Sequence, residues 1–177
     1  VMTFLGTDNK HYYAQNDNGS SFGPFGPIPA GMVQNPAFGP SATVLASNGT
    51  VVYAVYAGDN GQIYFSAKWG PGSVWDPSSQ APTSTVANTI RPFAFVDSES
   101  SLRIVYVRQS DNRICMVKRI TPQNSWTNEE AIASATTSKQ PSAVEVTPQG
   151  DIIVAYHGMM NEGIYFARGK DGAFGSI

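Results

Sequence analysis

The sequence is poor in cysteine, histidine and charge. Its 177 residues include one Cys and two His, 14% of the side chains are charged, and the formal net charge is -2. A single cysteine excludes an intrachain disulfide and a multi-thiolate metal site, so we interpret Cys115 as a small buried hydrophobe. With 11 basic and 13 acidic residues, the chain offers no broad positive field, which argues against a nucleic-acid partner.

Long apolar runs are also missing. The longest, such as 50–57, cover a few residues, whereas a transmembrane helix needs about 20, so we expect no membrane insertion. No His or carboxylate cluster has the spacing of a metal site, and we expect neither a metal nor another cofactor. The low charge and the 11% of aromatic residues are not typical of disorder. A folded domain rich in loops is therefore expected.

What the sequence does contain is a repeat of about fifty residues. Three similar stretches open at Pro40, Pro92 and Pro141, and the N-terminus supplies the back part of another copy in 1–5 and 11–14. Short runs rich in Val, Ile, Tyr and Phe alternate with Asn-Gly or Asp-Asn turns, as in 51–56, 63–66, 102–107, 114–117, 152–156 and 164–167. This pattern is typical of antiparallel strands joined by hairpins. The sequence therefore predicts an all-β chain.

An aromatic residue follows the third run of each unit and is interpreted as the anchor of a fourth strand. These residues are Phe22, Trp75, Trp126 and Phe174. Four strands per unit predict a β-propeller whose blades are four-stranded antiparallel sheets. We expect a single propeller domain or propeller segment with repeat units at approximately 1–39, 40–91, 92–140 and 141–177. We expect about four blades, of which the first lacks its innermost strand. These blades form either a closed ring or part of an incomplete one.

Residues 15–22 resemble the Asp-box, or bacterial neuraminidase repeat, of sialidase-like propellers and propeller lectins. In its pattern, Ser-x-Asp-x-Gly-x-Thr-Trp, this chain matches in kind at Asp17, Gly19, Ser21 and Phe22, whereas Gln15 departs from the leading Ser. A shortened copy contains Asp171, Gly172 and Phe174. The resemblance implies a structural turn, in which the carboxylate accepts backbone N–H groups and the aromatic packs beneath. We also expect a secreted or cell-surface protein, with any signal sequence already removed.

The loops opposite the Asp-box turns are the expected place for a binding site. The segments 26–39, 76–91 and 127–140 are rich in Pro, Ser, Thr and Asn, and function in β scaffolds usually lies on such loops. At this rim the repeats place the candidate ligand-binding residues Tyr56, Arg91, Arg108, Gln140 and His157. Forked arginine donors and aromatic faces suit a sugar. The alternative is that these are solvated strand ends.

Trp69 departs from the repeat and is a candidate stacking platform. The sequons at Asn18 and Asn48 are either glycosylation sites or simple Asn-Gly turns.

Three functions follow from this pattern. The first, which we favour, is a non-catalytic glycan-binding module of the lectin or adhesin type, with carbohydrate as its partner. The second is a sialidase-like glycoside hydrolase or a fragment of one. The resemblance would then make Arg91 and Arg108 substrate-binding arginines and Tyr56 a nucleophile, but no complete catalytic set is present. The third is a structural or assembly propeller whose ring is completed by another chain, which can be a second copy, or by upstream sequence, because an incomplete first blade exposes its edge strands.

Overall fold

The computed structural model of the chain contains β-strands and no helix in the part that it describes. The described residues are 2–8, 10–16, 21–28, 44–47, 49–58, 60–70, 72–87, 90–121, 123–145, 147, 149–160, 163–170 and 173–176. Their strands form four antiparallel sheets that follow one another along the chain. We call these sheets blade 1 to blade 4. The expectation of an all-β chain built from antiparallel blades is confirmed.

Each blade is a short series of neighbouring strands. Blade 1 contains β1 (Met2–Leu5), β2 (His11–Ala14) and β3 (Gly26–Pro27). Blade 2 contains β4 (Val44–Ser47), β5 (Val51–Ala57), β6 (Ile63–Trp69) and β7 (Ser79–Gln80). Blade 3 contains β8 (Phe93–Val96), β9 (Leu102–Val107), β10 (Arg113–Ile120), β11 (Ser125–Trp126) and β12 (Glu130–Thr136). Blade 4 contains β13 (Ser142–Glu145), β14 (Ile152–His157), β15 (Ile164–Lys170) and β16 (Ala173–Ser176).

Tight turns between the second and third strands of a blade fix the strand register. In blade 2, the Gly58 N–H donates to the Gln62 carbonyl over 2.8 Å, and Gly61 takes the positive φ of 72° that favours glycine. The turn therefore pairs Val55 with Phe65 and Tyr56 with Tyr64. Because successive side chains of a strand point to opposite faces, this register decides which residues meet the blade before and which meet the blade after.

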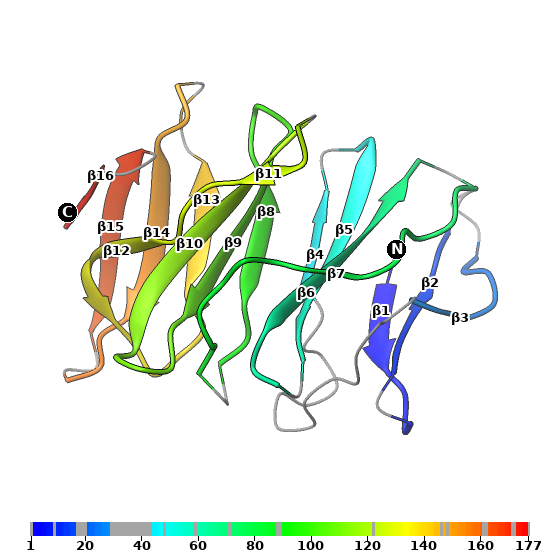
Figure 1. Cartoon of the computed structure of the whole chain (residues 1–177), viewed down its shortest axis with the longest axis horizontal. Helices are drawn as coiled ribbons and strands as arrows, with labels where there is room; N and C mark the ends of the chain where they lie inside the picture. Colours follow the sequence, from blue (N-terminus) through cyan, green and yellow to red (C-terminus); the bar gives the residue numbers. More distant parts are fainter. Residues whose placement is uncertain are drawn as a thin grey trace.

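The four blades lie side by side in one row, with blade 1 and blade 4 at its opposite ends (Figure 1). The first strands of blades 2, 3 and 4, which are β4, β8 and β13, are neighbours in space. The first strand of each of these blades thus lies toward the same inner side of the row. This is the arrangement of a β-propeller, in which blades pack face to face around an axis.

Apolar cores fill the spaces between neighbouring blades. Between blades 2 and 3, the core includes Tyr53, Val55 and Phe65 from one side and Ile104 and Val117 from the other. Burying side chains of this size stabilises the fold by roughly 1.5–3 kcal/mol each. Blades 3 and 4 meet through a second core that includes Ile114, Met116, Ile132, Ile152 and Val154. On its other face, blade 2 packs against blade 1 through a core that includes Ile28, Ala54 and Trp75, so blades 2 and 3 are packed on both faces.

A buried ionic cluster joins strands inside blade 3. Asp97, in the turn after β8, accepts a hydrogen bond from Arg103 Nε over 2.8 Å, and both side chains are almost fully buried. Asp97 also accepts the backbone N–H of Ser101, and Lys118 Nζ lies 3.5 Å from the same carboxylate. Because a buried charge is costly unless it is paired, this cluster holds the β8–β9 turn against β10.

Two local features differ from the sequence-based expectation. The segment 127–140, expected to be a loop, contains β12, which pairs with β10; its Ile132 is fully buried and draws the segment onto the sheet. The sequence predicts that Phe22 anchors the last strand of blade 1, but its side chain is 49% exposed. The last strand of blade 1 is instead β3, which follows Phe22 in the chain and pairs with β2. Trp75, Trp126 and Phe174 do contact cores between blades.

Candidate functional site

A polar hollow of about 510 Å³ lies where blade 2 meets blade 3. Its lining comes from Gln62 before β6, from residues 83–85 in the connection between the blades, and from residues 108–110 after β9. Backbone hydrogen bonds hold these segments together, since the Gln109 N–H donates to the Thr85 carbonyl and the Val86 N–H donates to the Gly61 carbonyl. The hollow is therefore on the face where the sequence placed the site, at a junction between two blades.

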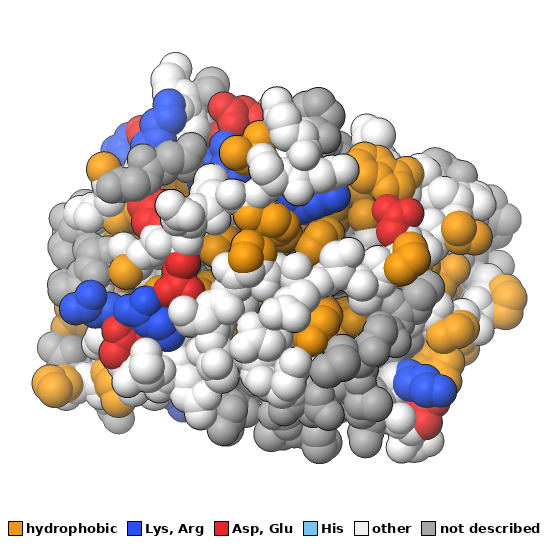
Figure 2. All heavy atoms as spheres, viewed as in Figure 1, with side chains coloured by type: hydrophobic (Ala, Val, Ile, Leu, Met, Phe, Trp, Pro, Cys, Tyr) orange, Lys and Arg blue, Asp and Glu red, His pale blue; other side chains and the backbone are white. Residues whose placement is uncertain are grey.

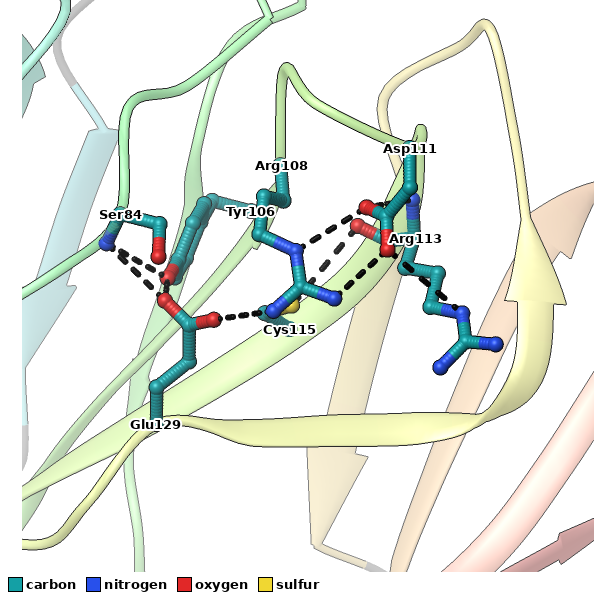
Figure 3. Close-up of polar contacts among 7 residues, drawn as sticks. All are labelled: Ser84, Tyr106, Arg108, Asp111, Arg113, Cys115 and Glu129. Carbon is teal, nitrogen blue, oxygen red and sulfur yellow. Dashed lines mark hydrogen bonds and ion pairs between the residues drawn. The ribbon is translucent and has the colours of Figure 1, made fainter.

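Arg108 lies between two carboxylates at the wall of this hollow (Figure 3). Its Nε and Nη2 donate to the two carboxylate oxygens of Asp111 over 3.0 and 2.6 Å. Its Nη1 donates to Oε1 of Glu129 over 2.7 Å. The bidentate pair fixes the plane of the guanidinium, and the second carboxylate compensates its charge further.

Glu129 joins the β11–β12 segment of blade 3 to the connection between blades 2 and 3. Its Oε2 accepts hydrogen bonds from the Tyr106 hydroxyl and from the Ser84 N–H, the latter over 2.9 Å. Ser84 belongs to the connection between blades 2 and 3, whereas Glu129 immediately precedes β12, the last strand of blade 3. Figure 3 shows the Glu129 side chain directed toward both Tyr106 and Arg108. The Glu129 carboxylate thus holds Ser84 and Arg108, two lining residues of the hollow, in fixed positions.

The contacts shift the pKa values of these groups. Burial alone would raise the pKa of Glu129, but hydrogen bonds from Tyr106, Ser84 and Arg108 lower it to about 2. The hydrogen bond from Arg108 lowers the pKa of Asp111 to about 2. Burial raises the pKa of the Tyr106 hydroxyl, and its bond to Glu129 raises it further. Both carboxylates are therefore charged at neutral pH, and Tyr106 stays protonated.

The charges around the hollow nearly cancel. Arg108 faces Asp111 and Glu129, and the Nε of Arg113 lies 3.6 Å from Asp111, so two positive and two negative groups meet. Side chains of both signs are also interspersed over the face of the molecule shown in Figure 2. The wall of the hollow consequently carries little net charge, and it offers a ligand hydrogen-bond donors and acceptors.

A second hollow of about 350 Å³ opens beside blade 3 and is lined by Arg103, Met116, Lys118 and residues 127–130. The two cations of its wall belong to the buried cluster around Asp97, and Lys118 Nζ also contacts Glu99 over 2.5 Å. These contacts make the charged side of this hollow part of the fold of blade 3.

Two of the sequence-predicted residues are not in the lining of the polar hollow. Tyr56 is fully buried, donates its hydroxyl hydrogen bond to Ser78 over 2.8 Å and stacks on Tyr64, so it is packed within the fold. Trp69 is 45% exposed but is the last residue of β6, at the end of the strand opposite Gln62, where its Nε1 donates to Asp76. Neither side chain lines the hollow.

The other rim candidates lie at the expected strand ends. Arg91 shortly precedes β8, and Gln140 precedes β13 and donates from Nε2 to the Pro92 carbonyl over 3.1 Å. His157 ends β14, and its Nδ1 is buried with no hydrogen-bond partner among the described residues. Among the rim candidates, Arg108 is the one in the lining of the polar hollow.

Most of the Asp-box residues and the asparagines of both sequons lie outside the described residues: Asp17, Asn18, Gly19, Asn48, Asp171 and Gly172. Ser21 is exposed, and Phe174 in β16 packs toward blade 3. The Asp-box interpretation stays a prediction.

Sequence reasoning missed the role of Glu129. It is one of two consecutive acidic residues in a segment interpreted as a loop, and the sequence gives no indication that it turns back to Arg108. Within the described ranges no group of three or more His, Cys, Asp or Glu could hold a metal ion. No helix long and apolar enough to cross a membrane occurs in the part of the chain that the structure describes.

Comparisons with known proteins support the fold. No family model matches the sequence, and no curated protein matches it. Among solved structures, AofleA from Arthrobotrys oligospora is similar with a TM-score of 0.69 at 15% identity, over 99% of this chain and 52% of that one. The Hadza microbial sialidase Hz136 is similar with a TM-score of 0.63 at 10% identity, over 95% of this chain and 40% of that one.

A polysaccharide lyase, an ulvan lyase bound to a GlcA–Rha3S repeat, is similar with a TM-score of 0.56 at 16% identity, over 85% of this chain and 38% of that one. These likenesses show a sialidase-like β-propeller fold. The chain spans about half the length of AofleA and less of the two enzymes.

Proposed function

We propose that the protein is a non-catalytic glycan-binding module that takes neutral sugars in the hollow between blades 2 and 3. The observation that carries this proposal is the pairing of Arg108 with both Asp111 and Glu129. A carboxylate sugar needs an uncompensated cation, and the charge of Arg108 is already balanced. A neutral sugar needs fixed donors and acceptors for its hydroxyl groups, which a paired arginine and carboxylate provide together.

The rest of the lining fits the same ligand. Gln62, Ser84, Gln109 and Ser110 add amide and hydroxyl groups to the wall. The Thr83 hydroxyl is buried in this wall and has no hydrogen-bond partner among the described residues. Such a group is satisfied by a bound water or by a ligand hydroxyl. The volume of about 510 Å³ is in the range of small-molecule sites.

The burial of Tyr56 argues against the alternative of a sialidase-like hydrolase, for which it was the candidate nucleophile. A hydroxyl that is enclosed by the fold and bonded to Ser78 is not positioned to attack a substrate in the hollow. Two of the similar solved structures are carbohydrate-active enzymes, which supports carbohydrate as the ligand class. A protein that binds glycans also fits the expected secreted or cell-surface location.

The test is a glycan-array screen followed by calorimetry on the best neutral and acidic sugars. We expect neutral glycans to bind. Gln109→Ala should raise the Kd about tenfold, because the loss of one polar contact worth about 1.4 kcal/mol changes the Kd by that factor. Gln109 is exposed, so the substitution should leave the melting temperature unchanged. Arg168→Met, which removes an arginine on β15 in blade 4, is the matched control and should bind as the wild type does.

Three results would overturn the proposal. The first is preferential binding of acidic sugars, and the second is no binding of any glycan. The third is release of the fluorophore from a fluorogenic sialoside, which would make the protein a hydrolase.

A further inference from the structure

The turns between the second and third strands align the blades residue by residue. Each is closed by a hydrogen bond from the N–H of the residue after the second strand to a carbonyl at the beginning of the third strand or just before it: Gly58 to Gln62, Arg108 to Arg113, and Gly158 to Gly163. The residues that follow are therefore equivalent in blades 2, 3 and 4. One equivalent set is Ile63, Ile114 and Ile164, and the other is Phe65, Met116 and Phe166.

In blades 2 and 3 these residues are buried against the next blade. Ile63 and Phe65 belong to the core shared with blade 3 and are 0% and 6% exposed. Ile114 and Met116 belong to the core shared with blade 4 and are 0% and 2% exposed. This face of a blade, which we call the forward face, is thus the one that receives the following blade.

In blade 4 the forward face has the same apolar character but is open. Ile164 is 71% exposed and Phe166 is 46% exposed, and blade 4 stands at the end of the row (Figure 1). The nearby turn adds Met159 and Met160, which are 50% and 99% exposed. Exposed apolar side chains of this size on one face of a sheet, as Ile164 and Phe166 are, mark an interaction surface. Ile164 and Phe166 are equivalent to residues that are buried against a following blade in blades 2 and 3, so the surface that fits them is the face of another blade.

We propose that the forward face of blade 4 binds blade 1 of a second copy of this chain. The contacts between blades 2 and 3 and between blades 3 and 4 each join a forward face to the opposite face of the following blade, so the proposed contact continues an interface that the row already contains. A blade of the same repeat has the matching strand spacing and twist. Blade 1 is the natural partner because it stands at the other end of the row, where no described blade precedes it.

The number of blades is compatible with this pairing. Four sheets are described in one chain, and two copies would bring eight, within the range of about 4–8 blades of known propellers. A contact that joins different faces of two identical subunits closes into a ring when the rotation allows it.

The test measures the mass of the purified chain by light scattering during size-exclusion chromatography, over a wide range of concentrations. We expect at least twice the 18.9 kDa of one chain at high concentration. Ile164→Asp and Phe166→Asp should each reduce the mass to one chain, because a carboxylate in this interface would be buried unpaired. Both positions are exposed in the single chain, so far-UV circular dichroism should remain that of the wild type.

Val74→Asp is the matched control. Val74 is 80% exposed in blade 2, away from the forward face of blade 4, so this variant should assemble as the wild type does. A wild type with the mass of one chain at every concentration would overturn the proposal. An assembly that survives both Ile164→Asp and Phe166→Asp would overturn it as well, because the copies would then meet elsewhere.

Discussion

Asp97 and Arg103 form an ion pair of 2.8 Å inside blade 3, with side chains that are 1% and 3% exposed. The two residues are six apart in sequence and face each other across the β8–β9 turn, whose N–H groups at Glu99 and Ser101 also donate to Asp97. The carboxylate thus neutralises a buried cation and shapes the turn at once.

The Asp97→Asn substitution should destabilise the protein strongly. It removes the carboxylate charge that faces the buried guanidinium of Arg103, and breaking a buried ion pair costs about 3–5 kcal/mol. Urea unfolding monitored by tryptophan fluorescence measures the loss. Glu99→Gln is the control, because Glu99 is 71% exposed and its contact with Lys118 should be worth at most about 1 kcal/mol. Equal effects of the two substitutions would contradict a special role for the buried pair.

The free energy of unfolding should decrease as the pH is lowered through the range in which Glu129 takes up a proton. Its pKa is about 2 in the folded protein against an ordinary value of 4.5, so the unfolded chain takes up the proton first. The contribution of the charged carboxylate is complete above about pH 4.5 and is lost as the pH falls to about 2. Melting temperatures of the wild type and Glu129→Gln should therefore converge across this window. A constant difference from neutral pH to pH 2 would show that the charge of Glu129 does not matter.

Cys115 should be unreactive in the folded protein. The thiol is fully buried, and burial together with the nearby Glu129 carboxylate raises its pKa to about 12. The thiolate is the reactive form, so Ellman's reagent at pH 8 should label the native chain far more slowly than the chain in denaturant. Equal labelling rates in the two conditions would mean that the β10 core opens readily.

Gly169→Ala should weaken the last strand of blade 4. A Cβ at Gly169 would lie 2.4 Å from the Ala173 carbonyl oxygen and 2.6 Å from Phe174 Cα, so the β15–β16 hairpin would have to shift. Overpacking of this kind costs about 1–3 kcal/mol. Gly175→Ala is a control within the same hairpin, because a Cβ there meets nothing within 4 Å. Thermal unfolding of both variants measures the difference, and we expect little change from the control.

The strands that the sequence predicted well are those with strong β-forming residues and clear turns. The run 102–107 corresponds to β9 without any change of bounds, and 51–56 matches β5 to within one residue. Val, Ile and Tyr favour strands, and the Gly or Asn turns between them limit the possible registers. The repeat then supplied the order of the blades.

What the sequence could not show depends on contacts between distant residues. The strand β12 is rich in Ala and Ser, which favour strands weakly, and it forms because Ile132 enters the core between blades 3 and 4. Glu129 joins the site because this strand positions the residue before it. The exposure of Phe22 and the burial of Tyr56 likewise follow from tertiary packing rather than from their places in the repeat.

The polar hollow lies at the junction between blades 2 and 3, so each copy of the chain carries at least this one site. Two copies joined in one ring would hold two such sites at a fixed distance from each other. A multivalent glycan surface would then favour the closed ring over two free chains, because the second contact is intramolecular.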